Sequence, residues 1–153
     1  TVITGIAGKK GFSVISIEKS MMNAEIGFGR RVLGVLEDEG ISFEHLPSGI
    51  DNMSVVIESA VLDGRRDKVL TSINRAVRAD SITIEDGLAL IAVVGLGMVK
   101  YKGTAARVFD ALAGAGVNIR MIDQGSSELS IIVGVEEHDF EKAVRAIYNE
   151  FVK

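Results

Sequence analysis

The chain has 153 residues, of which 47% are hydrophobic and 25% charged, and 17 Lys and Arg against 21 Asp and Glu leave a net charge of -4. This composition indicates a folded globular protein. The absence of cysteine excludes disulfide scaffolds, iron–sulfur clusters and thiol catalysis, and the small acidic charge argues against a nucleic-acid partner. The lack of cysteine also fits a reducing cytoplasm, where we expect the protein. No apolar run reaches the ~18 residues of a membrane span, so we expect no membrane partner.

The first seven residues, TVITGIA, form a strand-like run. They include neither an initiator methionine nor the charged and apolar regions of a signal peptide. We therefore expect the chain to be a piece of a longer polypeptide.

A β-branched run over Phe12–Glu18 predicts the next strand. A glycine-containing loop and a helix follow, and Gly40 stands where the helix should end. The helix carries an apolar stripe at helical spacing: Phe28, Val32, Leu33 and Leu36.

Two strands and a second helix come next. Alternating residues between Ile41 and His45 predict a strand, and a turn at Ser48-Gly49 joins it to another over Met53–Glu58. The second helix has a stripe of Val69, Leu70, Ile73 and Val77. Ser81–Glu85 is a fourth strand, so residues 12–86 complete a βαββαβ unit of the ferredoxin-like type.

The same order recurs at an offset of 76 residues, which indicates an internal repeat. The offset pairs several identical residues: Gly27 with Gly103, Arg31 with Arg107, Leu36 with Leu112, Gly40 with Gly116, Gly49 with Gly125 and Ser54 with Ser130. The predicted elements of the second copy are a strand over Leu88–Val94, a helix, a strand through Val117, Ile119 and Met121, a strand over Glu128–Val135, and a last helix with Phe140, Ala143, Val144, Ile147 and Phe151 on one face.

The second copy ends in its helix and lacks a fourth strand of its own. The strand-like run at the start of the chain is the natural replacement, because a sheet without that strand leaves backbone groups unpaired. The predicted fold is therefore α+β, with two ferredoxin-like units whose antiparallel sheets carry helices on one face. The first domain, 12–86, is inserted into a second made of 1–7 plus 88–153.

This fold hosts enzymes, nucleic-acid binders, metal carriers and ligand sensors. With eight aromatic residues and two histidines, the chain lacks the stacking platform of an RNA-binding sheet and the ligands of a metal carrier. We find no phosphate loop, nucleophile elbow or catalytic residues, so we expect no catalysis, no metal and no cofactor in this chain.

The loop KSMMNAEIGFGRR, residues 19–31, is the strongest candidate site. A Gly-Phe-Gly at a helix start presents free backbone N–H groups that suit a carboxylate, although the glycines could equally serve the turn alone. The acids near it, Glu25, Glu44 and Asp51, are replaced in the second copy by Tyr101, Arg120 and Ser127. This contrast favours a zwitterionic ligand with an additional cationic group in the first copy.

Two long segments, KSMMNAEIGFGRRVLGVLEDEGISFEHLPSGIDNMSVVIES and GTAARVFDALAGAGVNIRMIDQGSSELSIIVGV, strongly resemble the regulatory C-terminal region of aspartate kinases, which is built from two ACT domains in tandem. The resemblance covers nearly the whole chain but not the catalytic lobe. It implies feedback inhibition of a kinase that acts on the aspartate carboxylate with ATP and Mg, by lysine or threonine. It also implies a homodimer formed through ACT domains and contact with the kinase lobe of the same chain.

The resemblance also assigns residues. In lysine-sensitive members the effector lies between first ACT domains of two chains, which points to Met22, Glu25, Gly27, Phe28, Gly29, Ser42, Phe43, Glu44, Ser48, Ile50 and Asp51. In threonine-sensitive members the equivalent loops bind, which points to Asn118 and Ile119; Asp123 could bind a ligand or cap a turn. The acids favour lysine over threonine. The alternative is an assembly module that dimerises without any ligand.

Overall fold

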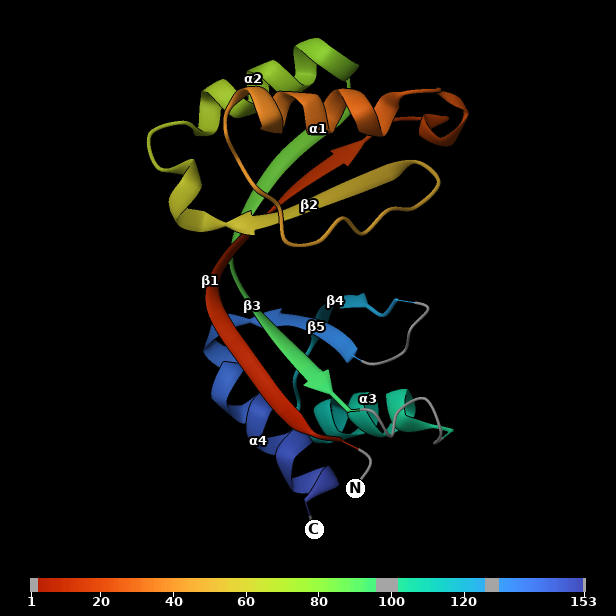
Figure 1. The fold of residues 1–153 in the computed structure, drawn as a ribbon, viewed down its shortest axis with the longest axis vertical. Coiled ribbons are helices and arrows are strands. Elements are labelled where there is room, and N and C mark those ends of the chain that lie inside the picture. Colours follow the sequence, from red (N-terminus) through yellow and green to blue (C-terminus); the bar gives the residue numbers. More distant parts are fainter. Residues whose placement is uncertain (1–2, 96–101, 126–129, 153) are drawn as a thin grey trace. The chain divides into compact units, whose positions relative to one another are not determined.

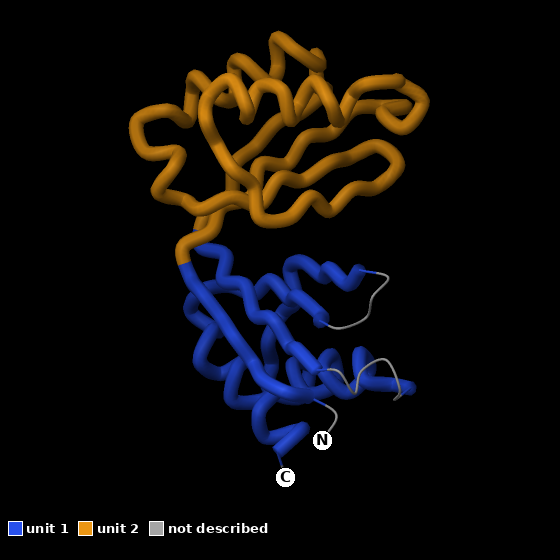
Figure 2. Tube along the Cα trace, in the orientation of Figure 1, with its two compact units in different colours: residues 1–10, 87–153 blue, residues 11–86 orange. Residues whose placement is uncertain are grey.

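A computed structural model of the chain describes residues 3–95, 102–125 and 130–152. The chain divides into two compact units: unit 1 contains residues 1–10 and 87–153, and unit 2 contains residues 11–86 (Figure 2). The chain thus begins in unit 1, forms all of unit 2 and returns to unit 1. From the sequence we expected domains of 1–7 plus 88–153 and of 12–86.

Unit 2 packs two helices on one face of an antiparallel sheet (Figure 1). The sheet contains the second half of β1 (Gly5–Glu18), β2 (Asn52–Glu58) and the first half of β3 (Ser81–Val94). The helices α1 (Phe28–Asp38) and α2 (Arg66–Val77) contact each other. Short 3-10 helices, η1 (Met22–Ala24) and η2 (Ser59–Leu62), precede them.

The core of unit 2 follows from the two periodicities read in the sequence. Strand β1 pairs with β2 from Phe12 opposite Glu58 to Glu18 opposite Asn52, and alternate residues of β1 face the helices. The predicted helix stripes supply the other side. Fully buried members of this core include Ile15, Ile17, Val32, Ile57, Leu62, Val69 and Ile73.

The predicted strand between Ile41 and His45 is wrong. Residues 41–48 make only two isolated bridges, between His45 and Val56 and between Ser48 and Met53. Glu44 N–H and His45 C=O both bond Val56, which places two residues opposite one. Further along, Pro47 accepts a bond from the Ser54 N–H but has no N–H to return it. The bulge and the proline together interrupt a regular ladder.

Unit 1 repeats the arrangement with the second half of β3, α3 (Thr104–Gly114), β4 (Ile119–Asp123), β5 (Ser130–Glu136), η4 (Glu137–Asp139) and α4 (Phe140–Phe151). Strand β5 is paired on both sides, with β3 and with β4. Helices α3 and α4 contact each other and cover one face of this sheet (Figure 1). The ferredoxin-like α+β fold class is therefore confirmed.

Two strands run through both units instead of the four separate strands expected at 1–7, 12–18, 81–85 and 88–94. β1 and β3 have 14 residues each and are neighbours in the sheet order β2-β1-β3-β5-β4. Each carries one glycine with a left-handed backbone at the unit boundary, Gly11 (φ 94°) and Gly87 (φ 77°). Other residues rarely adopt this conformation, so these glycines let a strand continue from one unit into the next.

The sequence suggested one offset of 76 residues for the whole repeat, but in the structure the offset changes along the chain. Helices α1 and α3 keep the offset of 76 residues. Ser54 pairs with Ser16, however, and the equivalent strand pair in unit 1 is Ile132 with Ala92, an offset of 78 for β2 and β5. His45 and Met121 still match, since they pair with Val56 and Gly134. Two additional residues therefore lie between Met121 and β5, and matching Ser54 with Ser130 was wrong.

Candidate functional site: the loop before helix α1

The loop between β1 and α1 folds back on itself through short backbone bonds. The Met22 N–H donates to Lys19 C=O and the Glu25 N–H to Met22 C=O, each at 3.1 Å. Met21 adopts a left-handed backbone (φ 61°), which is uncommon for a residue with a side chain. The turn buries Met22 in the core and leaves Met21 and Ile26 exposed.

The segment that leads into β2, residues 48–51, packs on this loop and is called the 48–51 hairpin below. The Lys19 N–H donates to Asp51 C=O at 2.9 Å, and the Asn23 N–H donates to Ile50 C=O at 3.1 Å. One carboxylate oxygen of Asp51 accepts the Met21 N–H at 3.0 Å. Ile50 and Asp51, which the sequence places far from Met22, are thus brought beside it.

Helix α1 begins with the predicted Gly-Phe-Gly. Gly27 is the N-cap with φ 83°, and no side chain caps the helix. The Phe28 N–H reaches Glu25 C=O at 3.3 Å, and the Phe28 ring is buried. A Cβ at Gly29 would meet no atom within 4 Å outside the backbone of its own helix, so there is open space beside the first turn at this position. Such a helix start carries partial positive charge suited to an anion.

Glu25 is held by two cations. Its Oε1 lies 2.8 Å from Lys19 Nζ, and its Oε2 accepts a bond from Arg31 Nη2. The hydrogen bond from Lys19 and the nearby charges of Lys19 and Arg31 hold the pKa of Glu25 below its ordinary value. The sequence predicted that Glu25, with Glu44 and Asp51, would lie near the ammonium groups of a ligand; in the structure Lys19 and Arg31 already balance its negative charge.

Ser42 and Phe43 line a different feature, a hollow of about 320 Å³ with Leu33, Leu36, Glu37 and Ile41. A second hollow of about 450 Å³ shares Leu33 and Glu37 and adds Arg30, Arg31 and Gly34. Together they follow the exposed side of α1. Leu33 and Glu37 are not among the residues predicted for the site; their spacing of four residues places them on one face of the helix.

Glu44 directly follows Ser42 and Phe43, which line the first of these hollows. Its N–H is bonded to Val56 C=O at 2.7 Å and its side chain is exposed. Within the described residues, its carboxylate has no hydrogen bond or ion pair. Ser48 is also exposed, and its hydroxyl donates to Leu46 C=O at 3.2 Å.

The corresponding residues of unit 1 have other partners. Arg107 bonds Glu150 at the end of α4, with Nε to Oε1 at 3.2 Å, and lies over the Phe151 ring. Arg120 pairs with Glu136 at 2.9 Å. Tyr101 and Ser127, two of the expected replacements for the acids, lie outside the described residues.

The three second-copy candidates lie along one hairpin of unit 1. Asn118 is exposed just before β4, Ile119 opens that strand opposite Val135, and Asp123 ends it opposite Ile132. Asp123 has an interaction partner. All three lie in β4 or at its ends. The position of Asp123 is compatible with capping a turn as well as with binding a ligand.

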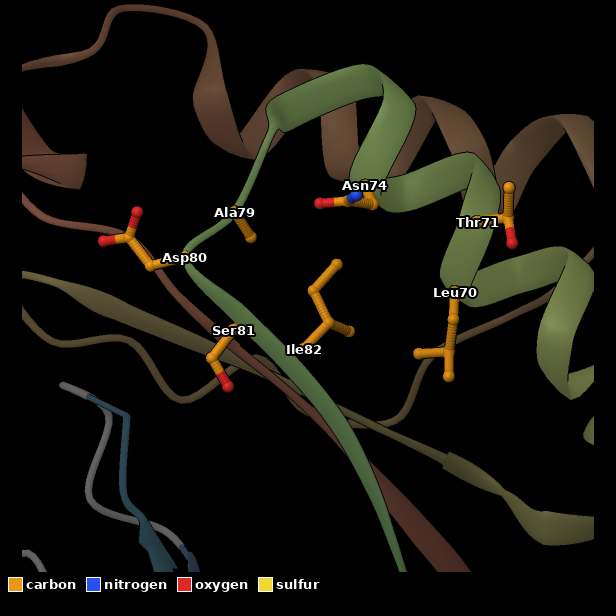
Figure 3. Close-up of a pocket in the computed structure, with 7 residues that line it drawn as sticks. All are labelled: Leu70, Thr71, Asn74, Ala79, Asp80, Ser81 and Ile82. Carbon is orange, nitrogen blue, oxygen red and sulfur yellow. The ribbon is translucent and has the colours of Figure 1, made fainter.

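A further hollow in unit 2, of about 380 Å³, lies between α2 and the start of β3 (Figure 3). Leu70, Thr71 and Asn74 line it from the helix, and Ala79–Ile82 line it from the strand side. Asp80 connects it to the loop, because its carboxylate accepts the Ser20 N–H at 2.8 Å. No residue predicted for the site lines this hollow.

Comparisons with known proteins were made over the whole chain. The family model described as ACT domain matches residues 91–151. Aspartokinase 3 of Bacillus subtilis is 47% identical over 150 residues, which are 97% of this chain and 33% of that protein. The solved aspartate kinase of Clostridium acetobutylicum is 58% identical with a TM-score of 0.94, covering 97% of this chain and 34% of that one.

Two solved structures share the fold at lower identity. The regulatory subunit of aspartate kinase from Thermus flavus is 21% identical with a TM-score of 0.83, covering 97% of this chain and 98% of that one. Aspartokinase III of E. coli in complex with lysine and aspartate is 22% identical with a TM-score of 0.79, covering 99% and 34%.

The described helices include none long and apolar enough to span a membrane. The chain spans about a third of the length of the Bacillus and Clostridium proteins, and it spans almost all of the separate Thermus regulatory subunit. Over 97% of its length, therefore, the chain is similar to about a third of aspartate kinases, and its residues 91–151 match the ACT domain model.

Proposed function

We propose that this chain is the allosteric regulatory region of an aspartate kinase and binds an end-product amino acid, lysine in preference to threonine, for feedback inhibition of the aspartate pathway. The observation that carries the proposal is the uncapped glycine start of α1 with the 48–51 hairpin docked beside it. The match to aspartate kinases and the lysine bound to the E. coli relative support it.

In this proposal, different features of unit 2 bind the two ends of lysine. The first-turn N–H groups near Gly29 would donate hydrogen bonds to the α-carboxylate. The exposed acids Glu44 and Asp51 would attract the ammonium groups. The hollow lined by Ser42 and Phe43 against α1 would take the aliphatic part of the side chain. Threonine has no second ammonium group, so Glu44 would add nothing to its affinity.

The parent protein would be a cytoplasmic ATP-dependent phosphotransferase acting on the aspartate carboxylate. ATP and Mg would be bound by a kinase lobe of the same chain, and this regulatory chain would need no cofactor. A second copy would complete the effector site in a homodimer formed through ACT domains. Inhibition would then be a shift between two pairings, no larger than the difference in effector affinity between them.

Isothermal titration of the chain with lysine and with threonine tests the proposal. We expect a saturable heat with lysine and a weaker one with threonine. Absence of heat with either ligand at millimolar concentration, on a chain that is folded by circular dichroism, would refute effector binding.

The second candidate function is assembly without a ligand, which the exposed apolar residues Phe43 and Ile50 favour. Sedimentation velocity separates the two functions. An interfacial effector tightens the dimer by linkage, so lysine should lower the dimer dissociation constant. An assembly module would associate equally with and without lysine.

A further inference from the structure

The cluster of Lys19, Glu25 and Arg31 ties the candidate loop to both helices of unit 2. Lys19 Nζ donates to Val77 C=O at the end of α2 at 2.6 Å and lies 5.8 Å from the centre of the Phe28 ring. It also pairs with Glu25 in the loop. Arg31 on α1 pairs with the other oxygen of Glu25 and donates to Ile26 C=O at 3.3 Å.

The loop has a strained backbone and few buried side chains, so other interactions must hold its conformation. Met21 has a left-handed backbone, which costs a residue with a side chain of order 1 kcal/mol or more. Ile26 is 96% exposed and contributes nothing to the core. Within residues 19–29, therefore, only Met22 and, at the helix start, Phe28 are held by burial of their side chains. The ion cluster and the contacts to the 50–51 turn supply the remaining constraint.

Among the described residues of unit 1, the equivalent arginine has other partners. Arg107 stands at the position of Arg31 but pairs with Glu150 and Phe151 of α4. The residue that the repeat aligns with Glu25 is Tyr101, which is not an acid. The same helix position thus serves helix packing in unit 1 and loop attachment in unit 2.

The charge of the cluster argues against direct contact between Glu25 and a cationic ligand. One carboxylate faces two cations, so an approaching ammonium group meets a local excess of positive charge. We propose that Lys19, Glu25 and Arg31 form a clamp that holds the 19–29 loop in its effector-binding shape, with Glu25 as a positioning residue and not an ammonium contact. This inference rests on the proposed function.

Hydrogen exchange without ligand tests the clamp itself. In Glu25→Gln, Lys19→Met and Arg31→Met, amides of residues 20–27 should exchange about threefold faster than in the wild type, the size expected for loss of a part-exposed ion pair. Arg31→Lys, which keeps the charge, should retain most of the protection. Arg107→Met is the matched control and should leave this loop unchanged. Unchanged loop exchange in Glu25→Gln would overturn the clamp.

Lysine titration of the same variants distinguishes positioning from contact by the sign of the effect. If the cluster positions the loop, Lys19→Met and Arg31→Met weaken lysine binding, as Glu25→Gln does. If Glu25 instead contacts the ligand ammonium, removing its cationic neighbours frees the carboxylate and strengthens lysine binding, which would overturn the inference. Failure of the wild type to bind lysine would instead refute the proposed function, while the exchange measurement would still decide the clamp.

Discussion

At the residue scale, the three acids near the candidate loop differ in what already occupies them. Glu25 is neutralised by two cations. Asp51 accepts one backbone N–H through its side chain. Glu44 is exposed, and the part of the chain that the structure describes offers its carboxylate no partner. Glu44 is therefore the acid best able to distinguish lysine from threonine.

Replacing Glu44 with Ala should weaken lysine binding about tenfold, the typical value of a charge-assisted hydrogen bond, and change threonine binding little. Isothermal titration with both amino acids measures the two effects. Asp110→Ala, which removes an exposed acid from α3 in the other unit, is the control for net charge. Equal losses for lysine and threonine in Glu44→Ala would argue against a cation pocket.

Asp86 links stability to pH. The hydrogen bond from Arg66 and a second from the buried Ser13 hydroxyl hold the pKa of Asp86 below its ordinary value of 3.8. A lowered folded-state pKa stabilises the fold above the unfolded-state pKa, and this contribution is lost as pH falls through the folded-state value. Asp86 thus contributes at neutral pH and not in strong acid.

Asp86→Asn should therefore lower the free energy of unfolding at pH 7, and the difference from the wild type should shrink as pH falls below about 4. Urea unfolding at a series of pH values measures this. Asp38→Asn, at an exposed position of α1, is the control. A difference that stays constant from pH 7 to pH 2.5 would show that the ion pair does not stabilise the fold.

At the scale of elements, α1 and α3 begin in the same way but in different surroundings. Gly27 and Gly103 are N-caps with φ values of 83° and 80°. A Cβ at Gly27 would lie 3.4 Å from Arg31 Nη1, whereas one at Gly103 would meet nothing within 4 Å. Only the start of α1 combines this geometry with a docked hairpin and an ion cluster among the described residues.

Gly27→Ala and Gly103→Ala should each lower the free energy of unfolding by about 1 kcal/mol, because alanine resists the left-handed backbone. Only Gly27→Ala should also weaken lysine binding, since it alters the loop that carries the site. Urea unfolding and isothermal titration of both variants measure the two effects. If Gly103→Ala weakens lysine binding as strongly, the effector site is not confined to unit 2.

At the scale of the whole molecule, the chain path makes unit 2 continuous and divides unit 1 into two segments. Residues 11–86 contain every strand of unit 2. Unit 1 needs the start of the chain, because Ile3 lies in its core and the Thr4 N–H donates to Val94 C=O at 2.6 Å. A fragment that begins at Gly87 therefore exposes apolar surface and an unpaired strand.

We expect the isolated fragment 87–153 to lack cooperative unfolding, whereas residues 11–86 fold alone. Joining residues 1–10 to 87–153 through a flexible linker should restore a cooperative transition, because it supplies the missing strand. Thermal unfolding followed by circular dichroism compares the three chains. A cooperative transition in 87–153 alone would mean that the first ten residues are dispensable.

Hydrophobic periodicity and the repeat were sufficient to predict the fold class, the four main helices and the glycine start of α1, because these depend on local spacing and on residues that one backbone conformation requires. The spacing could not show that β1 and β3 are continuous through both units, or that the 41–47 segment is irregular. Whether a strand continues through both units depends on which strands it pairs with in the folded sheet. The 41–47 segment is irregular because of Pro47 and a bulge opposite Val56.

The candidate site divides in the same way. The sequence by itself located the loop, its glycines and its acids, since residue type determines which groups can bind a carboxylate or an ammonium. Only the tertiary structure brought Ile50 and Asp51 to Met22, and only it paired Glu25 with Lys19 and Arg31 while leaving Glu44 exposed. A charged side chain is available to a ligand only where the fold does not already pair it. Pairing depends on distances between side chains, which the fold determines and the sequence alone does not give.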